Sequence, residues 1–142
     1  MLFGKRERLI RRIIVVEDEP LVAFDNEHML SAAGYEVVAT VDNVADALKV
    51  IETEELDLVL SDIRLSGDGS GIDVARAAHD RGLPVLFVTG NCDDVARRLG
   101  IGCLAKPYSS ADLRTALAAV EAHIQGRKAR RLPAGLELFE QA

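Results

Sequence analysis

The feature that most constrains the fold of this chain is an alternation of short apolar runs with longer helical patterns, repeated five times. The runs lie at residues 13–16, 36–40, 57–61, 84–88 and 101–105. Apolar runs of this length are typical of strands buried on both faces, and strands that alternate with helices form a parallel sheet. The pattern therefore predicts an α/β domain.

Residues that commonly begin and end helices bracket the segments between these runs. Pro20 suits the first turn of a helix that ends at Gly34, and Asn43 can cap the next one. Further helices are expected at 71–81, 91–99 and 110–125. Five such units fit a flavodoxin-like, doubly wound five-stranded parallel sheet of order 2-1-3-4-5, with five helices and a short fourth helix.

Charge is distributed unevenly along the 142 residues. The formal net charge is -6, but residues 1–12 carry +4 and residues 126–142 carry +2, which leaves -12 on the segment between them. An acidic body is a poor surface for nucleic acid, so no direct nucleic-acid partner is expected. No apolar stretch approaches the roughly 20 residues that span a bilayer, and we expect a cytoplasmic protein without a membrane partner.

The predicted organisation is a basic N-terminal arm at 1–11, one domain at 12–125 and a C-terminal tail at 126–142, with both ends solvated. Two cysteines are too few for a disulfide scaffold and lack the spacing of a zinc site. Cys103 is expected to be a small core residue, and a redox role for Cys92 is the less favoured reading.

Acidic side chains follow two of the predicted strands. Glu17 and Asp18 close the first apolar run and Asp62 closes the third. The carboxyl ends of parallel strands meet at one edge of a sheet, and three acids gathered there repel one another unless a cation is present. This pattern predicts a Mg²⁺ site, and Thr89 and Lys106 follow two later strands at the same edge. Together these groups favour phosphoryl-transfer chemistry.

Dinucleotide binding in a Rossmann fold is the alternative at the level of the fold. The first strand is followed by Glu17-Asp18-Glu19-Pro20, where a glycine-rich turn would be needed to hold a pyrophosphate. An acidic turn repels that group, so the sequence disfavours this alternative.

Four motifs in this order resemble those of bacterial two-component response-regulator receiver domains: Val16-Glu17-Asp18-Glu19-Pro20, Ser61-Asp62-Ile63-Arg64-Leu65, Phe87-Val88-Thr89-Gly90 and Lys106-Pro107. The resemblance covers about residues 12–125. It implies that Asp62 is the phosphoacceptor, that Glu17, Asp18, Asp62 and the backbone carbonyl of Arg64 bind Mg²⁺, that Thr89 is a switch hydroxyl and that Lys106 contacts the phosphoryl group.

The same resemblance implies a signalling protein that catalyses only its own phosphorylation and dephosphorylation. The phosphoryl group would come from a sensor histidine kinase or a histidine phosphotransfer protein. Because no effector domain fits outside residues 12–125, we expect a stand-alone receiver. Its output would then be contact with a downstream protein target, or the shuttling of phosphate in a phosphorelay.

Two departures from the common receiver pattern concern the region after Thr89. Many receivers place an aromatic switch residue three positions before the lysine, where this chain has Cys103, and only 17 positions separate Thr89 from Lys106. Both features resemble the FATGUY group of single-domain response regulators, although Asn91 stands where that group has an aromatic residue. We therefore expect residues 90–100 to be mobile and to become ordered on phosphorylation.

Two other functions remain as alternatives. A haloacid-dehalogenase-like phosphatase would use Asp62 as nucleophile, but it needs a second acid two residues later, where this chain has Arg64. A pseudo-receiver would keep the fold as a binding module without being phosphorylated.

Overall fold

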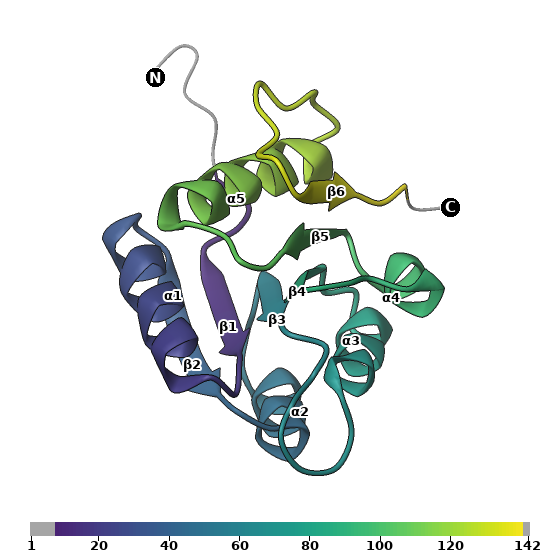
Figure 1. Ribbon diagram of the computed structural model, residues 1–142. Coiled ribbons are helices and arrows are strands. Elements are labelled where there is room, and N and C mark those ends of the chain that lie inside the picture. Colours follow the sequence, from purple (N-terminus) through teal and green to yellow (C-terminus); the bar gives the residue numbers. More distant parts are fainter. Residues whose placement is uncertain (1–7, 141–142) are drawn as a thin grey trace.

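Six strands form one sheet with helices on both of its faces in the computed structural model, which describes residues 8–140 (Figure 1). Residues 1–7 of the predicted arm and residues 141–142 of the predicted tail lie outside this range. The elements are β1 Arg12–Val16, α1 Pro20–Ala32, β2 Glu36–Val41, α2 Val44–Thr53, β3 Leu58–Ser61, α3 Gly71–Asp80, β4 Val85–Thr89, α4 Asp94–Leu99, β5 Gly102–Ala105, α5 Ser110–Ile124 and β6 Leu136–Leu138.

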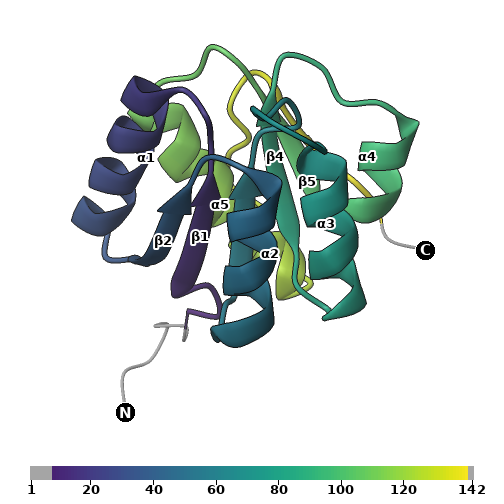
Figure 2. The same ribbon diagram turned by 90° about the horizontal axis from the view of Figure 1, so that it is seen from below.

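The first strand shows why the sheet is covered on both faces. Successive side chains of a strand point to opposite faces. Ile13 and Val15 pack in the cluster that α1 and α5 cover, whereas Ile14 and Val16 pack in the cluster that α2, α3 and α4 cover (Figure 2). All four side chains are fully buried. The apolar run therefore contributes to two cores at once, as expected for a central parallel strand.

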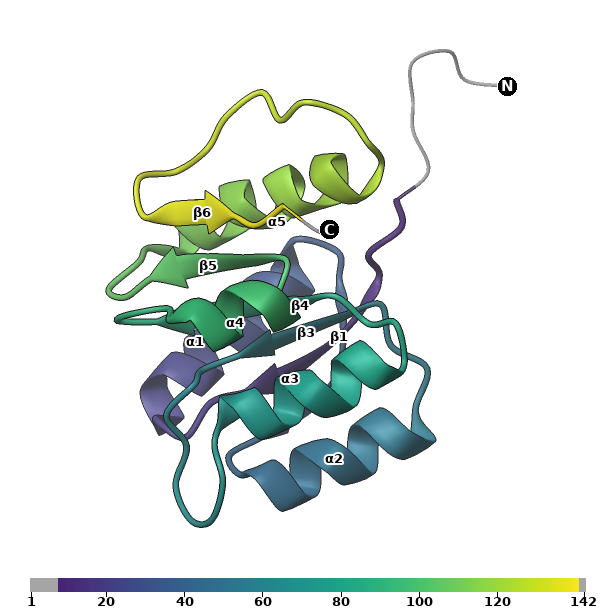
Figure 3. The same cartoon turned by 90° about the vertical axis from the view of Figure 1, so that its right-hand side faces the viewer.

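The five parallel strands have the predicted order 2-1-3-4-5, but the prediction of a five-stranded sheet was wrong. A sixth strand, β6, pairs antiparallel with β5 and extends the order to 2-1-3-4-5-6 (Figure 3). Gly102 allows β6 to approach β5 closely, because a Cβ at this position would lie 2.8 Å from the backbone oxygen of Glu137. Phe139 follows β6 and is buried. Part of the tail that we expected to be solvated is thus built into the sheet.

Two contacts also join this tail to α4. The guanidinium of Arg97 forms an ion pair with Glu137 and stacks over the ring of Phe139, 5.4 Å from its centroid. The short fourth helix was predicted correctly, but it starts later than expected, because Asp93 caps it by accepting a hydrogen bond from the backbone N–H of Ala96.

The expectation for the cysteines was wrong in one respect. Cys103 is buried as predicted, but it forms a disulfide with Cys92, and their Cα atoms are 6.5 Å apart. Cys103 lies on β5 beside Phe87 of β4, and Cys92 lies three residues beyond the end of β4. The neighbouring strands therefore bring together two residues that are 11 positions apart in the sequence.

None of the helices within residues 8–140 is long and apolar enough to cross a membrane.

Candidate functional site

The register of the sheet brings Glu17 and Asp62 to the same edge. Val16 pairs with Ser61, so the next residue of each strand is one of these two acids. The backbone N–H of Asp62 donates to the carbonyl of Val16 at 3.0 Å, which continues the pairing to the end of β1. Asp18 follows in the turn to α1. The three predicted acids are therefore neighbours, each with a carboxylate oxygen within 4.8 Å of the others.

Lys106 reaches this acidic group from β5. Thr89 pairs with Ala105, and the backbone N–H of Lys106 donates to the carbonyl of Thr89 at 3.0 Å. From this position the Lys106 Nζ donates to Glu17 Oε1 and to Asp62 Oδ2, both at 2.8 Å. A third carboxylate, that of Glu19, lies 3.8 Å away. The ammonium thus bridges the ends of β1 and β3.

In both Glu17 and Lys106, burial and hydrogen bonding shift the pKa in opposite directions. Glu17 is 1% exposed, and burial raises the pKa of its carboxyl group, an effect that the hydrogen bond from Lys106 partly opposes. Burial alone would lower the pKa of Lys106, but its hydrogen bonds to Asp62 and Glu17 more than offset burial and raise that pKa above its ordinary value. Lys106 therefore stays charged throughout the physiological range of pH.

The donor set fits a hydrated divalent cation. When Glu17, Asp18 and Asp62 are ionised, the ammonium of Lys106 balances one of three negative charges, and two remain within a few ångströms of one another. Carboxylate oxygens are the ligands that Mg²⁺ takes in proteins, usually together with several waters. The residues predicted to bind Mg²⁺ thus carry the ligand chemistry and the charge that this ion needs.

Asp62 combines restraint with access to a cavity. It is 6% exposed, its Oδ1 accepts from the backbone N–H of Arg64 at 3.2 Å and its Oδ2 accepts from Lys106. Asp62 nevertheless lines a cavity of about 610 Å³, which Asp18, Thr89, Arg64 and Lys106 also line. Every residue of the predicted site except Glu17 borders this cavity, and Glu17 is buried and accepts a hydrogen bond from Lys106.

The hydroxyl of Thr89 makes no hydrogen bond to any residue in the range 8–140, although the residue is only 6% exposed. Thr89 ends β4 and faces the same cavity as Asp62. An unpaired donor in this position is available to a group that enters the cavity.

Sequence reasoning missed two residues that hold the site in place. Gly71 begins α3, and a Cβ there would lie 2.0 Å from the carbonyl oxygen of Asp62, so only glycine permits this close packing. Ser66 donates from its hydroxyl to Asp18 Oδ2 at 2.9 Å. The cluster of glycines at 67, 69 and 71 was the signal that this loop makes a close approach.

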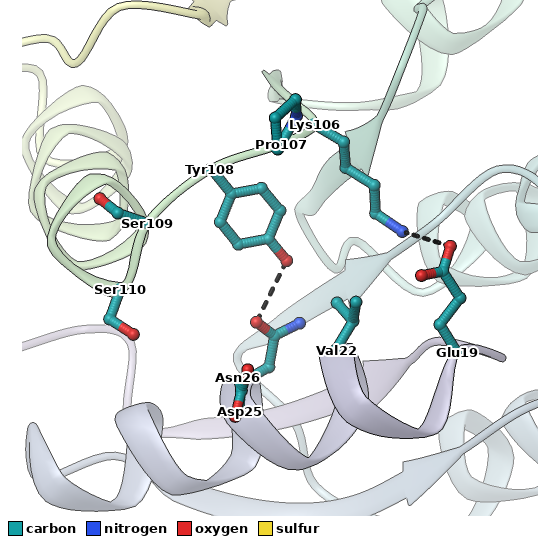
Figure 4. Close-up of a pocket in the computed structure, with 9 residues that line it drawn as sticks. All are labelled: Glu19, Val22, Asp25, Asn26, Lys106, Pro107, Tyr108, Ser109 and Ser110. Carbon is teal, nitrogen blue, oxygen red and sulfur yellow. Dashed lines mark hydrogen bonds and ion pairs between the residues drawn. The ribbon is translucent and has the colours of Figure 1, made fainter.

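A second cavity, of about 580 Å³, adjoins the first between α1 and the segment that leads into α5 (Figure 4). Lys106 lines both cavities. The Tyr108 hydroxyl donates to Asn26 Oδ1 at 3.1 Å, and burial raises the pKa of Tyr108. On the solvent side of α1, Leu21 is 80% exposed and Phe24 is 66% exposed. The acidic site thus lies beside a surface with exposed apolar groups.

Comparison with known families agrees with the motifs and the geometry. Residues 13–118 match the family described as the response regulator receiver domain, which is most of the chain. The chain belongs to this family. Receiver domains are signalling modules of two-component systems, and the acidic pocket at the end of the receiver sheet usually binds Mg²⁺.

Several relatives of this receiver are known. The transcriptional regulatory protein PdtaR of Mycobacterium tuberculosis is 34% identical over 113 residues, which are 75% of this chain and 55% of PdtaR. This receiver therefore spans about half the length of the curated relatives it matches.

Two solved structures resemble this receiver closely. SdrG from Sphingomonas melonis Fr1 is 34% identical, with a TM-score of 0.68 over 80% of this chain and 98% of SdrG. The response regulator PhyR from Brucella abortus is 31% identical, with a TM-score of 0.68 over 84% of this chain and 51% of PhyR.

Proposed function

We propose that this receiver accepts a phosphoryl group on Asp62 in two-component signalling and passes the signal on by protein-protein contact or by phosphate shuttling. The observation that carries the proposal is the position of Asp62. Its carboxylate lines an open cavity while Lys106 and the backbone N–H of Arg64 hold its two oxygens. A carboxylate held in this way is aligned for attack on a phosphorus atom that enters the cavity.

The proposed step forms one bond and breaks one. An Asp62 carboxylate oxygen attacks the phosphorus of a phosphohistidine, the P–O bond forms, the P–N bond breaks and the imidazole nitrogen leaves with its electron pair. Lys106 can turn its ammonium from the carboxylates to the transferred phosphoryl oxygens, since it already lies 2.8 Å from Asp62. The free hydroxyl of Thr89 donates to a phosphoryl oxygen, which draws the end of β4 toward Asp62.

Glu17, Asp18, Asp62 and the backbone carbonyl of Arg64 would hold Mg²⁺ in this site. When bound, the ion neutralises charge that develops on the phosphoryl oxygens. Asp18 is the partly exposed member of the three acids, and Ser66 orients it through a hydrogen bond. Glu17 keeps Lys106 in the site, because its buried carboxylate accepts from the ammonium.

The partners in this proposal are a sensor histidine kinase or a histidine phosphotransfer protein, a downstream protein target, and no nucleic acid bound directly. A cytoplasmic location follows from such partners. The second cavity, which shares Lys106 with the cavity of Asp62, and the exposed Leu21 and Phe24 of α1 support a docking surface for the partner that brings the donor histidine. Apolar groups of this kind commonly contribute to protein interfaces.

The test uses phosphoramidate, a small donor that shares the P–N bond of phosphohistidine. Wild-type protein with Mg²⁺ should gain one phosphoryl group, seen as a retarded band on a phosphate-affinity gel. Asp62→Asn should gain none, whereas Asp68→Asn, a change of an exposed acid in the following loop, should behave as wild type.

The same experiment separates the alternatives. A retarded band that persists in Asp62→Asn would contradict the assignment of the phosphoacceptor. No phosphorylation of wild type would indicate a pseudo-receiver. Repeated turnover of a phosphate monoester such as p-nitrophenyl phosphate, lost in Asp62→Asn, would indicate a phosphatase of the haloacid-dehalogenase type.

A further inference from the structure

The disulfide joins the two segments that deliver Thr89 and Lys106 to the site. Cys92 follows Thr89 by three residues, and Cys103 precedes Lys106 by three residues. The covalent bond therefore spans α4 and ties the loop after β4 to β5. A disulfide only three residues from Thr89 restricts any movement of Thr89.

Other restraints on this loop are few. Within the part of the chain that the structure describes, the backbone of residues 90–92 makes no hydrogen bond, and Gly90 and Asn91 are exposed. The α4 helix that follows has only six residues, which is too short to be stable without tertiary contacts. Besides the peptide bond that joins Gly90 to β4, the disulfide is thus the main link between residues 90–92 and the sheet, and it runs to β5.

We propose that Cys92 and Cys103 form a reversible thiol–disulfide site that controls how the receiver responds to phosphorylation. With the bond closed, the loop is held on β5 and Thr89 cannot be drawn freely toward a phosphoryl group on Asp62. With two free thiols, the segment 90–100 can rearrange. This inference rests on the proposed phosphorylation of Asp62 and adds to it a second input, the redox state of the surroundings.

The chemistry of the site needs an external disulfide or dithiol. In oxidation, one cysteine thiolate attacks a sulfur of a low-molecular-weight disulfide such as oxidised glutathione, forms a mixed disulfide and releases one thiol. The second cysteine thiolate then displaces the second thiol and closes the protein disulfide. Two protein thiols thus lose two electrons and two protons, and the small disulfide becomes two thiols.

The two cysteines differ in burial and therefore have different roles in this exchange. Cys103 is 7% exposed and packs in the core with Phe139, while Cys92 is only partly buried. An incoming thiolate therefore reaches the Cys92 sulfur, and Cys103 is the leaving group. In a reducing compartment, disulfides are usually transient and serve catalysis or redox sensing, which suits a bond in a loop next to the site.

Thermodynamic linkage requires the coupling between the disulfide and the phosphorylation site to be equal in both directions. If closing the disulfide weakens binding of a phosphoryl group by a given factor, then binding of a phosphoryl group must favour the open dithiol by that same factor. A disulfide that only supports the fold would not respond to the phosphorylation site in this way.

The experiment measures both directions with beryllium fluoride and Mg²⁺ as a phosphoryl mimic. We expect the oxidised protein to bind the mimic about fivefold or more weakly than the reduced protein, the lower end of coupling between linked sites. In glutathione buffers of varied ratio, saturating mimic should shift the midpoint of disulfide formation toward reduction by the same factor. Cys92→Ala should bind as reduced wild type in either buffer, with Cys103→Ala as a second variant.

The outcomes separate this inference from the proposed function. Equal affinity for the mimic in both redox states, with phosphoramidate labelling of Asp62 intact, would overturn the redox site alone. The redox site would also be overturned if the disulfide formed at no ratio of oxidised to reduced glutathione. If reduced wild type and Cys92→Ala neither bind the mimic nor take phosphoryl groups, the proposed function fails and the inference fails with it.

Discussion

At the scale of single residues, Lys106 sets the charge balance of the site. Its ammonium is the cation that lies between the buried carboxylate of Glu17 and the carboxylate of Asp62. Removing one partner of a buried ion pair leaves the other charged group without compensation. The stability of the protein should therefore depend on Lys106 in a way that depends on pH.

Lys106→Met keeps the length of the side chain and removes the charge. At about pH 7.5 we expect the free energy of unfolding to fall by about 1–3 kcal/mol, because the buried carboxylate of Glu17 loses its ion pair and keeps only the hydrogen bond from the backbone N–H of Glu19. Urea unfolding measures this loss. Lys49→Met, which changes an exposed lysine on α2, should have little effect.

The loss should become smaller on acidification. Burial raises the pKa of Glu17 above its ordinary value of 4.5, so the folded protein holds this proton more tightly than the unfolded chain does. Stability from this group is therefore gained as pH falls through the raised pKa and lost as pH rises. Without Lys106 the pKa of Glu17 should rise further, and the variant should recover part of its deficit at about pH 5.5. A deficit that is the same at both pH values would contradict this account.

At the scale of elements, the β3–α3 connection fixes the position of Asp62 through the start of α3. The backbone N–H of Gly71 donates to the carbonyl of Ile63 at 2.7 Å, and Ser70 and Asp73 form a capping box that fixes the first turn of α3. This element end therefore lies directly against the strand end that carries the proposed phosphoacceptor.

Gly71→Ala should lower the free energy of unfolding by about 1–3 kcal/mol, the usual cost of an overpacked position. The added methyl group meets the backbone of Asp62 and Ile63, which cannot rotate away. Phosphoramidate labelling should slow as well, because the carboxylate of Asp62 is displaced. For the stability measurement Gly90→Ala is the matched control, since nothing lies within 4 Å of the added Cβ there. Equal urea midpoints for the two variants would show that the β3–α3 connection relaxes to accommodate the added methyl group, and would contradict this prediction.

The sequence predicted those elements and site residues whose signal is local. Each of the three acids stands at the end of an apolar run, so strand order alone was enough to place Glu17 and Asp62 together. The strand β6 gave no such signal, because three residues are too short for a pattern and their partner is set by tertiary packing. Likewise, the pairing of Cys92 with Cys103 depends on where two strand ends meet in space.

At the scale of the whole molecule, both ends of the described range, residues 8–140, are tied to the receiver. The carboxylate of Glu121 on α5 accepts from the backbone N–H groups of Leu9 and Ile10, and Ile10 is buried. At the other end, the backbone N–H of Phe139 donates to the carbonyl of Ile101 at 2.9 Å. Segments that composition alone marks as tails thus contribute to the core.

Phe139→Ala should lower the free energy of unfolding by about 3 kcal/mol, the low end for a buried phenylalanine, because a chain end relaxes more easily than an interior site. Amide hydrogen exchange should also become faster in β5 and β6, which the ring of Phe139 helps to hold together. Phe24→Ala removes an equal ring that is 66% exposed on α1 and should change stability far less. Similar losses for the two variants would show that the ring of Phe139 is not packed in solution.

The antiparallel strand β6 also has a consequence for recognition by strand addition. Partners that pair with the edge of a sheet need a strand with free backbone groups. The outer edge of β5 already pairs with residues 136–138 of the same chain. Any foreign strand therefore competes with a tethered one, whose effective concentration is of the order of millimolar for a short linker. At ordinary cellular concentrations β6 therefore outcompetes a foreign strand. The outer edge of β5 is accessible only to a partner that first displaces the tail.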